Sequence, residues 1–143
     1  MTTTPDSPAP RRIRIAAALV VGSGGRILLV RKRGTTAFMQ PGGKIDPGET
    51  PLDALRRELH EELGLVVPPS APHYLGHYTA PAANEPDALV DAELFRIAVV
   101  QQVQAANEIA EVRWVDPTAP GDLELAPLTR DHVLPISRSV VAP

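Results

Sequence analysis

The chain has 143 residues, 43% of them apolar, which is enough for one globular domain with a hydrophobic core. Its net charge of −3 argues against a protein that binds polymeric nucleic acid, because such proteins present a basic face. The lack of cysteine excludes disulfides, thiol nucleophiles and cysteine-ligated zinc, and it is compatible with the cytoplasmic location that we expect.

The first twelve residues are rich in threonine and proline, and the sequence predicts a disordered tail over residues 1–12. They contain no apolar stretch typical of a secretory signal. The apolar run at residues 15–21 is too short to cross a membrane, so we expect no membrane association. It belongs instead to a buried strand predicted over residues 13–21, which a glycine-rich turn joins to a second strand over residues 26–31.

A loop rich in glycine and proline, residues 34–48, precedes the best-marked element of the sequence. Thr50 is typical of a helix N-cap, Pro51 of the first helical position, and Gly64 of the left-handed residue that ends a helix. Between these positions, four leucines recur at helical spacing and form a stripe that we expect to be buried: Leu52, Leu55, Leu59 and Leu63. The sequence therefore predicts a helix between Thr50 and Gly64.

The second half of the chain is predicted to be mostly strands. Two are expected over residues 73–79 and 89–101, joined by a polar loop, and a shorter one over residues 112–116. A turn-rich segment follows, and then a short helix over residues 128–136 that Pro135 limits. The whole pattern indicates a single domain over residues 13–138, followed by a tail of residues 139–143.

Three carboxylates on the predicted helix indicate its chemistry. Glu58, Glu61 and Glu62 are spaced three and four residues apart, so they are neighbours that repel one another. At about 100° per residue, Glu58 and Glu62 fall on a flank of the leucine stripe, with Glu61 further round. Oxygen ligands in this arrangement suit a hard divalent cation, which would compensate the repulsion. A solvated acidic face is the alternative reading of the carboxylates alone.

The residues around these carboxylates match the Nudix box at every defined position, and the chain therefore resembles the Nudix hydrolases over most of its length. The match is carried by Gly43, Glu49, Arg57, Glu58, Leu59, Glu61, Glu62, Gly64 and Leu65. The resemblance implies an α/β fold, namely an α/β/α sandwich around a mixed sheet. It also implies hydrolysis, dependent on Mg²⁺ or Mn²⁺, of the diphosphate linkage in a nucleoside diphosphate derivative.

The resemblance also implies a metal-ligand set. Glu58 and Glu62 would be direct ligands, and Glu61 a ligand or the holder of a metal-bound water. The backbone carbonyl of Gly42 is a further candidate ligand, because glycine lets the backbone approach closely.

Arg57 would orient the carboxylates through a bidentate pair with Glu49. A fourth acid is expected in the loop before the last strand, where Glu108 is the first candidate and Glu111 the rival. Either acid could instead be exposed, and the identity of the general base stays open.

Candidate substrate contacts lie close to the box. Gly43 and Lys44 stand at the Gly-Gly turn and Arg31 ends the second strand, so each is a candidate for binding phosphate. An ordinary surface charge is the alternative for Arg31. Phe38 is a candidate wall of a base pocket, with core packing as its alternative.

The substrate is the least defined part of the prediction. A small single domain with little beyond the box resembles the members that hydrolyse (deoxy)nucleoside triphosphates, and this is the small-molecule substrate that we favour. ADP-ribose or a nucleotide sugar is the alternative, since Pro81 follows Leu65 by sixteen residues, close to a proline of the ADP-ribose-cleaving relatives. A non-catalytic nucleotide-binding regulator is less favoured because every acidic position is filled. Pairing as a homodimer is a further expectation from the resemblance.

Overall fold

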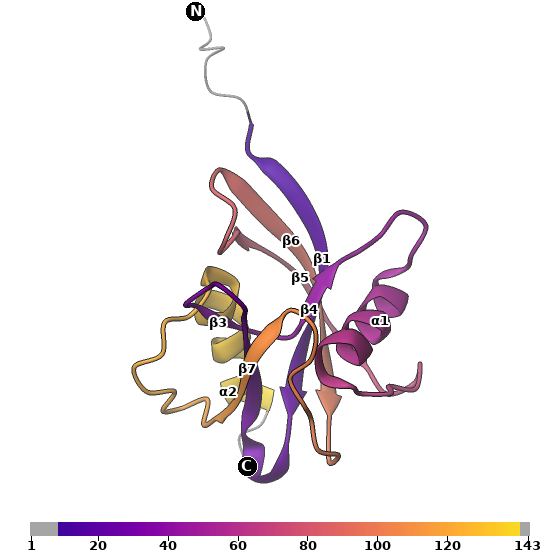
Figure 1. Cartoon of the computed structure of the whole chain (residues 1–143), viewed down its shortest axis with the longest axis vertical. Helices are drawn as coiled ribbons and strands as arrows, with labels where there is room; N and C mark the ends of the chain where they lie inside the picture. The colour runs from indigo at the N-terminus through magenta and orange to yellow at the C-terminus, as the bar shows by residue number, and fades with distance from the viewer. Residues whose placement is uncertain (1–8, 141–143) are drawn as a thin grey trace, which may run out of the picture.

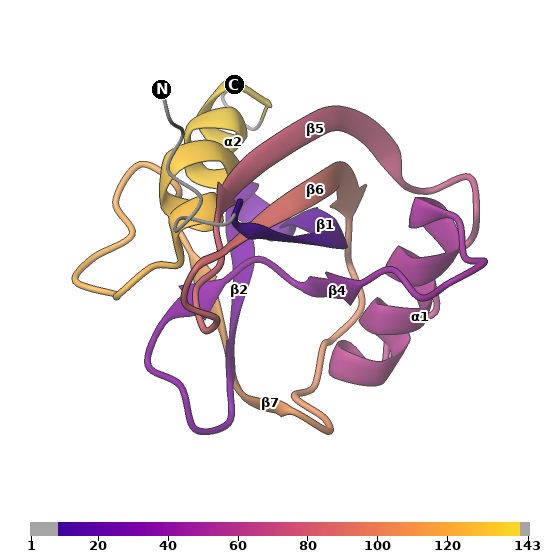
Figure 2. The same ribbon diagram turned by 90° about the horizontal axis from the view of Figure 1, so that it is seen from above.

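Strand β1, Arg11–Val21, occupies the centre of the sheet in the computed structural model, which describes residues 9–140 (Figures 1 and 2). It pairs in parallel with β6 along its whole length, and antiparallel with β4 and with the start of β2. The sheet order is β3-β2-β1-β6-β5, with β4 paired to β1 and β7 paired to β2. The other strands are β2 Ile27–Lys32, β3 Phe38–Met39, β4 Gly42–Lys44, β5 His73–Pro81, β6 Ala88–Ala98 and β7 Ile109–Val115.

A helical layer covers each face of this mixed sheet. Helix α1, Pro51–Leu63, packs over β4 and β1, and on the opposite face lie the π-helical turn η2, Thr129–Val133, and α2, Leu134–Val140 (Figure 2). A short turn, η1, Ser23–Gly25, joins β1 to β2. The fold is therefore the predicted α/β/α sandwich.

The core has two parts, one on each face of β1. Ala16, Ala18 and Val20 pack towards α1, whereas Ala17 and Leu19 pack towards η2 and α2. Successive side chains of a strand point to opposite faces, so a central strand that is covered on both sides must be apolar throughout. This explains the continuous apolar run in the sequence.

Helix α1 begins and ends where the sequence predicts. Thr50 Oγ1 accepts a hydrogen bond from the Asp53 N–H at 3.1 Å, which satisfies one free donor of the first turn. Gly64 adopts the left-handed conformation, with φ of 70°. Leu55, Leu59 and Leu63 are buried, as the leucine stripe predicts.

Other boundaries differ from the prediction. Strand β1 starts at Arg11 rather than residue 13, because both arginines at its start join the sheet: Arg11 forms an ion pair with Glu85, and Arg12 with Asp91 at 2.6 Å. The predicted loop of residues 34–48 contains β3 and β4, and β4 lies beside the central strand. The predicted tails lie in part outside the described residues, namely at residues 1–8 and 141–143.

The C-terminal helix continues past Pro135 to Val140, further than the predicted residue 136. Proline lacks an N–H and its ring collides with the carbonyl four residues back in a regular α-helix. Here the preceding turn is π-helical, and the Leu134 N–H bonds the Thr129 carbonyl five residues back. This wider turn removes the collision. Within residues 9–140, no helix is long and apolar enough to span a membrane.

Candidate active site

Two of the box carboxylates, Glu58 and Glu62, face the glycines of β4. The Gly42 N–H donates to Glu62 Oε1 at 3.1 Å. A Cβ atom added to Gly43 would lie 2.5 Å from Glu58 Cδ, so only glycine leaves room for this carboxylate. Because the two glutamates are one helical turn apart on α1, both reach the same short strand.

Both of these carboxylates have a raised pKa. Glu62 is only 3% exposed, and burial, together with the nearby charge of Glu58, raises its pKa to about 8. Burial also raises the pKa of Glu58, and the charges of Glu61 and Glu108 add to this rise. A buried pair of like charges is stabilised when a cation lies between or beside them. The pair therefore has the electrostatic character of a cation site.

Arg57 connects this pair to the loop before the helix. Its Nε and Nη2 atoms donate to the two carboxylate oxygens of Glu49 at 2.8 and 2.7 Å, which is the bidentate pair that the sequence predicts. Its Nη1 donates to Glu58 at 2.8 Å, and Nη2 also donates to the Lys44 carbonyl at 3.1 Å. The hydrogen bond from Arg57 lowers the pKa of Glu49 to about 2. Arg57 thereby fixes the orientation of Glu58 relative to β4.

A third box carboxylate, Glu61, is more exposed than the pair and shares Arg57 Nη1 with Glu58. Its side chain is 48% exposed and its only partner among the described residues is Arg57 Nη1, at 3.4 Å. Within residues 9–140, no three acidic or histidine side chains are arranged to hold a cation by themselves. Mg²⁺ is commonly bound by one or two carboxylates together with waters and substrate phosphates, so Glu58 and Glu62 fit an ion that is shared with a substrate.

Of the two candidates for a fourth acid, Glu108 is the one that faces the pair. Glu108 lines the same cavity as Gly42 and Gly43, and its charge contributes to the raised pKa of Glu62. Glu111 instead accepts hydrogen bonds from Arg113 at 2.6 Å and from Arg31 at 3.3 Å. These arginines, Arg113 first, lower the pKa of Glu111.

A cavity of about 550 Å³ opens beside β4. One group of its lining residues is polar or lacks a side chain: Lys32, Gly42, Gly43, Lys44, Glu85 and Glu108. Another group is aliphatic: Ile13, Ile15, Met39, Val90 and Leu128. The glycines of β4 line this cavity and also contact the two carboxylates on α1. The cavity thus combines basic side chains beside the acidic pair with an apolar surface that suits a flat ring.

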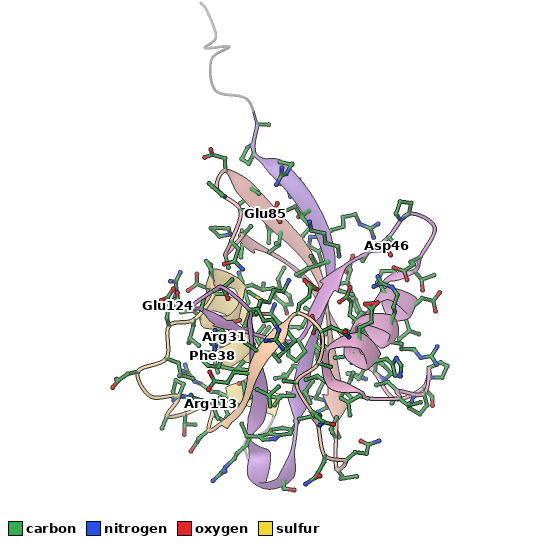
Figure 3. The ribbon with its side chains drawn as sticks, in the orientation of Figure 1. Arg31, Phe38, Asp46, Glu85, Arg113 and Glu124 are labelled. Carbon is green, nitrogen blue, oxygen red and sulfur yellow. The ribbon has the colours of Figure 1, made fainter. Side chains whose placement is uncertain are left out.

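For Arg31 and Phe38 the structure favours roles other than contact with a substrate in this cavity, since neither residue lines it. The Arg31 guanidinium is held by Glu111 and by the Thr35 carbonyl, the latter at 2.9 Å. Phe38 is 5% exposed in the core on the α2 face, and the Arg113 guanidinium lies 5.0 Å from its ring centroid. Figure 3 shows these residues together on the β2–β7 side of the sheet. The predicted contacts Gly43 and Lys44 do line the cavity.

The loop between β5 and β6 contributes cavity residues that sequence reasoning missed. Asn84 and Glu85 lie in this loop and line the cavity. Pairing of β6 with β1 brings the loop to this side of the sheet, and Figure 3 labels Glu85 in it. Glu85 Oε1 lies 3.5 Å from Lys44 Nζ. Gln40, Lys32 and Arg33 also line the cavity without having been assigned a role. No local sequence pattern indicates that these residues line a cavity, because their positions depend on how the strands pair.

Comparison with known proteins identifies the family. The NUDIX domain model matches residues 10–135, and the chain belongs to this family. It is 45% identical over 59 residues to an 8-oxo-dGTP diphosphatase of Haemophilus influenzae, covering 38% of this chain and 43% of that protein. It is 43% identical over 49 residues to an RNA pyrophosphohydrolase of Francisella tularensis subsp. mediasiatica, covering 34% of this chain and 32% of that protein. The chain thus spans less than half the length of these curated relatives.

A solved structure confirms the fold. The crystal structure of a MutT protein from Methanosarcina mazei Go1 matches with a TM-score of 0.76 at 23% sequence identity. The match covers 96% of this chain and 100% of that one. The sandwich and the order of its elements are therefore shared with that protein.

Proposed function

We propose that the protein is a divalent-metal-dependent hydrolase that cleaves the diphosphate linkage of a (deoxy)nucleoside triphosphate. The observation that carries the proposal is the position of Glu58 and Glu62 against the two glycines that line the cavity. Because Gly42 and Gly43 both contact these carboxylates and line the cavity, a cation on the carboxylates would lie close enough to be shared with a phosphate in the cavity. Membership of the Nudix family supports a hydrolase of phosphoric anhydrides.

In this proposal each residue has a defined task. Glu58 and Glu62, with the Gly42 carbonyl, would hold Mg²⁺ or Mn²⁺, which when bound neutralises phosphate charge and lowers the pKa of water. Arg57 keeps Glu58 turned towards β4. Lys44, at the cavity, supplies positive charge to the phosphates, and Lys32 does the same.

The choice of a triphosphate is supported by the relative named as an 8-oxo-dGTP diphosphatase and by the aliphatic part of the cavity. ADP-ribose is the second candidate because Pro81, the residue that suggested it, lines the cavity. The reaction products distinguish these two candidate substrates. They are measured in the presence of Mg²⁺ with a panel of nucleoside triphosphates, oxidised nucleotides, ADP-ribose and dinucleotides. A triphosphate yields a monophosphate and pyrophosphate, whereas ADP-ribose yields AMP and ribose phosphate. Tight binding of a nucleotide without any turnover would identify a regulator and contradict the proposal.

Glu62→Gln tests the role of the acidic pair. The amide keeps an oxygen that accepts from the Gly42 N–H and removes a buried charge, so we expect a melting temperature no lower than that of the wild type. We expect kcat/KM to fall about 100-fold or more, because even residues that only support a metal ligand contribute 10–100-fold. Glu111→Gln is the matched control, since Glu111 is held by arginines outside the cavity. An equal loss in both variants would rule out a special role for Glu62.

A further inference from the structure

Gln40 has a side chain that the proposed chemistry does not use. It lies between β3 and β4, lines the cavity, and is only 7% exposed. Its partner is Thr129 at the start of η2, which is fully buried. Thr129 Oγ1 donates to Gln40 Oε1 at 2.7 Å and accepts from the Gln40 backbone N–H at 3.2 Å.

This pair of hydrogen bonds fixes which end of the amide meets the cavity. The threonine hydroxyl has a single proton, and it is used on Oε1, so the amide oxygen is held against η2. The Nε2 group has two N–H donors, and it makes no hydrogen bond to any of residues 9–140. The same part of the chain contains no fully buried side-chain polar atom without a partner. Nε2 is therefore not fully buried. Because Gln40 lines the cavity, the cavity is the space from which a ligand can reach these N–H donors.

The backbone on both sides of Gln40 is also fixed. The Phe38 carbonyl accepts from the Ala126 N–H at 2.9 Å, and the Pro41 carbonyl accepts from the Ala18 N–H at 2.9 Å. These bonds tie the segment to the residues before η2 on one side and to the central strand on the other. A donor held in this way is preorganised for a ligand.

We propose that Gln40 selects the nucleobase, by presenting N–H donors to a carbonyl oxygen on the base of a nucleotide in the cavity. The proposal deepens the proposed function and rests on it only for the assumption that the ligand is a nucleotide. Because Oε1 is held by Thr129, the side chain donates but does not accept. It matches the 6-oxo group of guanine or hypoxanthine, and it opposes the 6-amino group of adenine, where donors would face donors. The aliphatic lining, including Ile15, Val90 and Leu128, provides surface for the ring.

The test compares dITP with dATP, whose bases differ at the 6-position and in the proton on N1. We expect wild-type kcat/KM to favour dITP by about tenfold or more, since an unpaired polar group in a binding site is strongly disfavoured. Methionine has a volume similar to that of glutamine but no N–H donor. In Gln40→Met the values of kcat/KM for dITP and dATP should therefore differ by no more than about threefold. Gln40→Glu offers only acceptors and should reverse the preference. Equal wild-type values, or a ratio that Gln40→Met leaves unchanged, would overturn the proposal.

Thr129 is a positioning residue in this scheme, and its variants test the orientation of the amide. Thr129→Val removes the hydroxyl and lets the amide turn, so the dITP/dATP ratio should approach that of Gln40→Met. Thr129→Ser keeps the hydroxyl and should keep the ratio. Loss of folded protein lowers both rates equally and does not change the ratio. A wild-type ratio in Thr129→Val would contradict the role of this hydrogen bond.

Binding of the monophosphates separates this inference from the proposed function. The affinities for dIMP and dAMP, measured by calorimetry without a metal, require no turnover. If the wild type hydrolyses no triphosphate but binds dIMP at least about tenfold more tightly than dAMP, the proposed function fails and the inference stands. If triphosphates are hydrolysed while the monophosphates bind equally or not at all, the function stands and the inference fails.

Discussion

At the scale of single residues, Gly43 decides how closely the cavity beside β4 approaches the acidic pair. A Cβ added to Gly43 would collide with the Glu58 carboxylate, and the same residue lines the cavity. Any side chain here would push Glu58 away from its position beside Arg57. The residue is therefore a sensitive test of whether this close approach matters.

We expect Gly43→Ala to reduce kcat/KM by about tenfold or more, because small displacements of catalytic groups are costly. Gly22→Ala is the matched control: its added Cβ would lie 2.5 Å from the Trp114 ring, a comparable collision away from the acidic pair. Thermal melting and steady-state kinetics distinguish the two. The control should lose stability but keep its kcat/KM, and the opposite pattern would contradict the proposed geometry.

Arg57→Lys tests the orientation of Glu58. Lysine keeps the charge but cannot form the bidentate pair with Glu49 while also reaching Glu58. We expect kcat/KM to fall by about 10–100-fold, the usual range for a residue that supports a metal ligand. Arg113→Lys, a change on the β7 side of the sheet, is the control. Wild-type activity in Arg57→Lys would show that the charge alone is sufficient.

How far the site can be predicted from the sequence depends on the distance between partners along the chain. The pair of Arg57 with Glu49 spans eight residues inside the Nudix box, and the family resemblance predicts it. Gln40 and Thr129 are 89 residues apart, and no local pattern indicates their contact. The same applies to Arg31, which the sequence suggests as a phosphate contact. Its guanidinium instead pairs with Glu111, 80 residues away, and no local pattern indicates this contact.

At the scale of elements, α1 carries the acidic pair and depends on its first turn. Thr50 satisfies the Asp53 N–H, and Pro51 presets the backbone at the first helical position. Helix α1 could be predicted from the sequence because its caps and its leucine stripe are local signals. Strands β3 and β4 could not, since two or three residues are too few to show a period.

Thr50→Ala should lower the free energy of unfolding by about 1 kcal/mol, the usual contribution of an N-cap side chain. Thr50→Ser retains a capping oxygen and should stay much closer to the wild type. Urea denaturation measures both, and an unchanged m-value would show that the variants unfold to the same extent. If serine and alanine proved equally destabilising, the hydrogen bond to Asp53 would not be the source of the stability.

At the scale of the whole molecule, the proposed function couples cation binding to stability. Burial and mutual repulsion disfavour the charged forms of Glu58 and Glu62, so a cation that binds these carboxylates only in the folded chain is expected to raise its stability by mass action. The sandwich that places these residues at the sheet was predicted from the family resemblance. The strand order follows from long-range pairing, which local patterns do not specify.

We expect Mg²⁺ at about 100 times its Kd to stabilise the wild type by about 2.7 kcal/mol. For a chain of this size the melting temperature should then rise by roughly 5–10 °C. The double variant Glu58→Gln/Glu62→Gln should show no such rise, and EDTA should abolish it in the wild type. A similar increase in the double variant would locate the cation elsewhere.

The pairing of β1 with β6 has a consequence for how the protein is made. Every partner of β1 in this ladder stands 77 residues further along the chain, as with Arg11 and Ala88. A nascent chain that has not yet emerged as far as Ala98 therefore has a central strand without its longest neighbour, although β2, β4 and α1 are already synthesised. Loop closure over such a distance is slow, and an apolar strand left open in the meantime attracts other chains. We therefore expect the central strand to be protected from aggregation on the ribosome only after β6 has emerged.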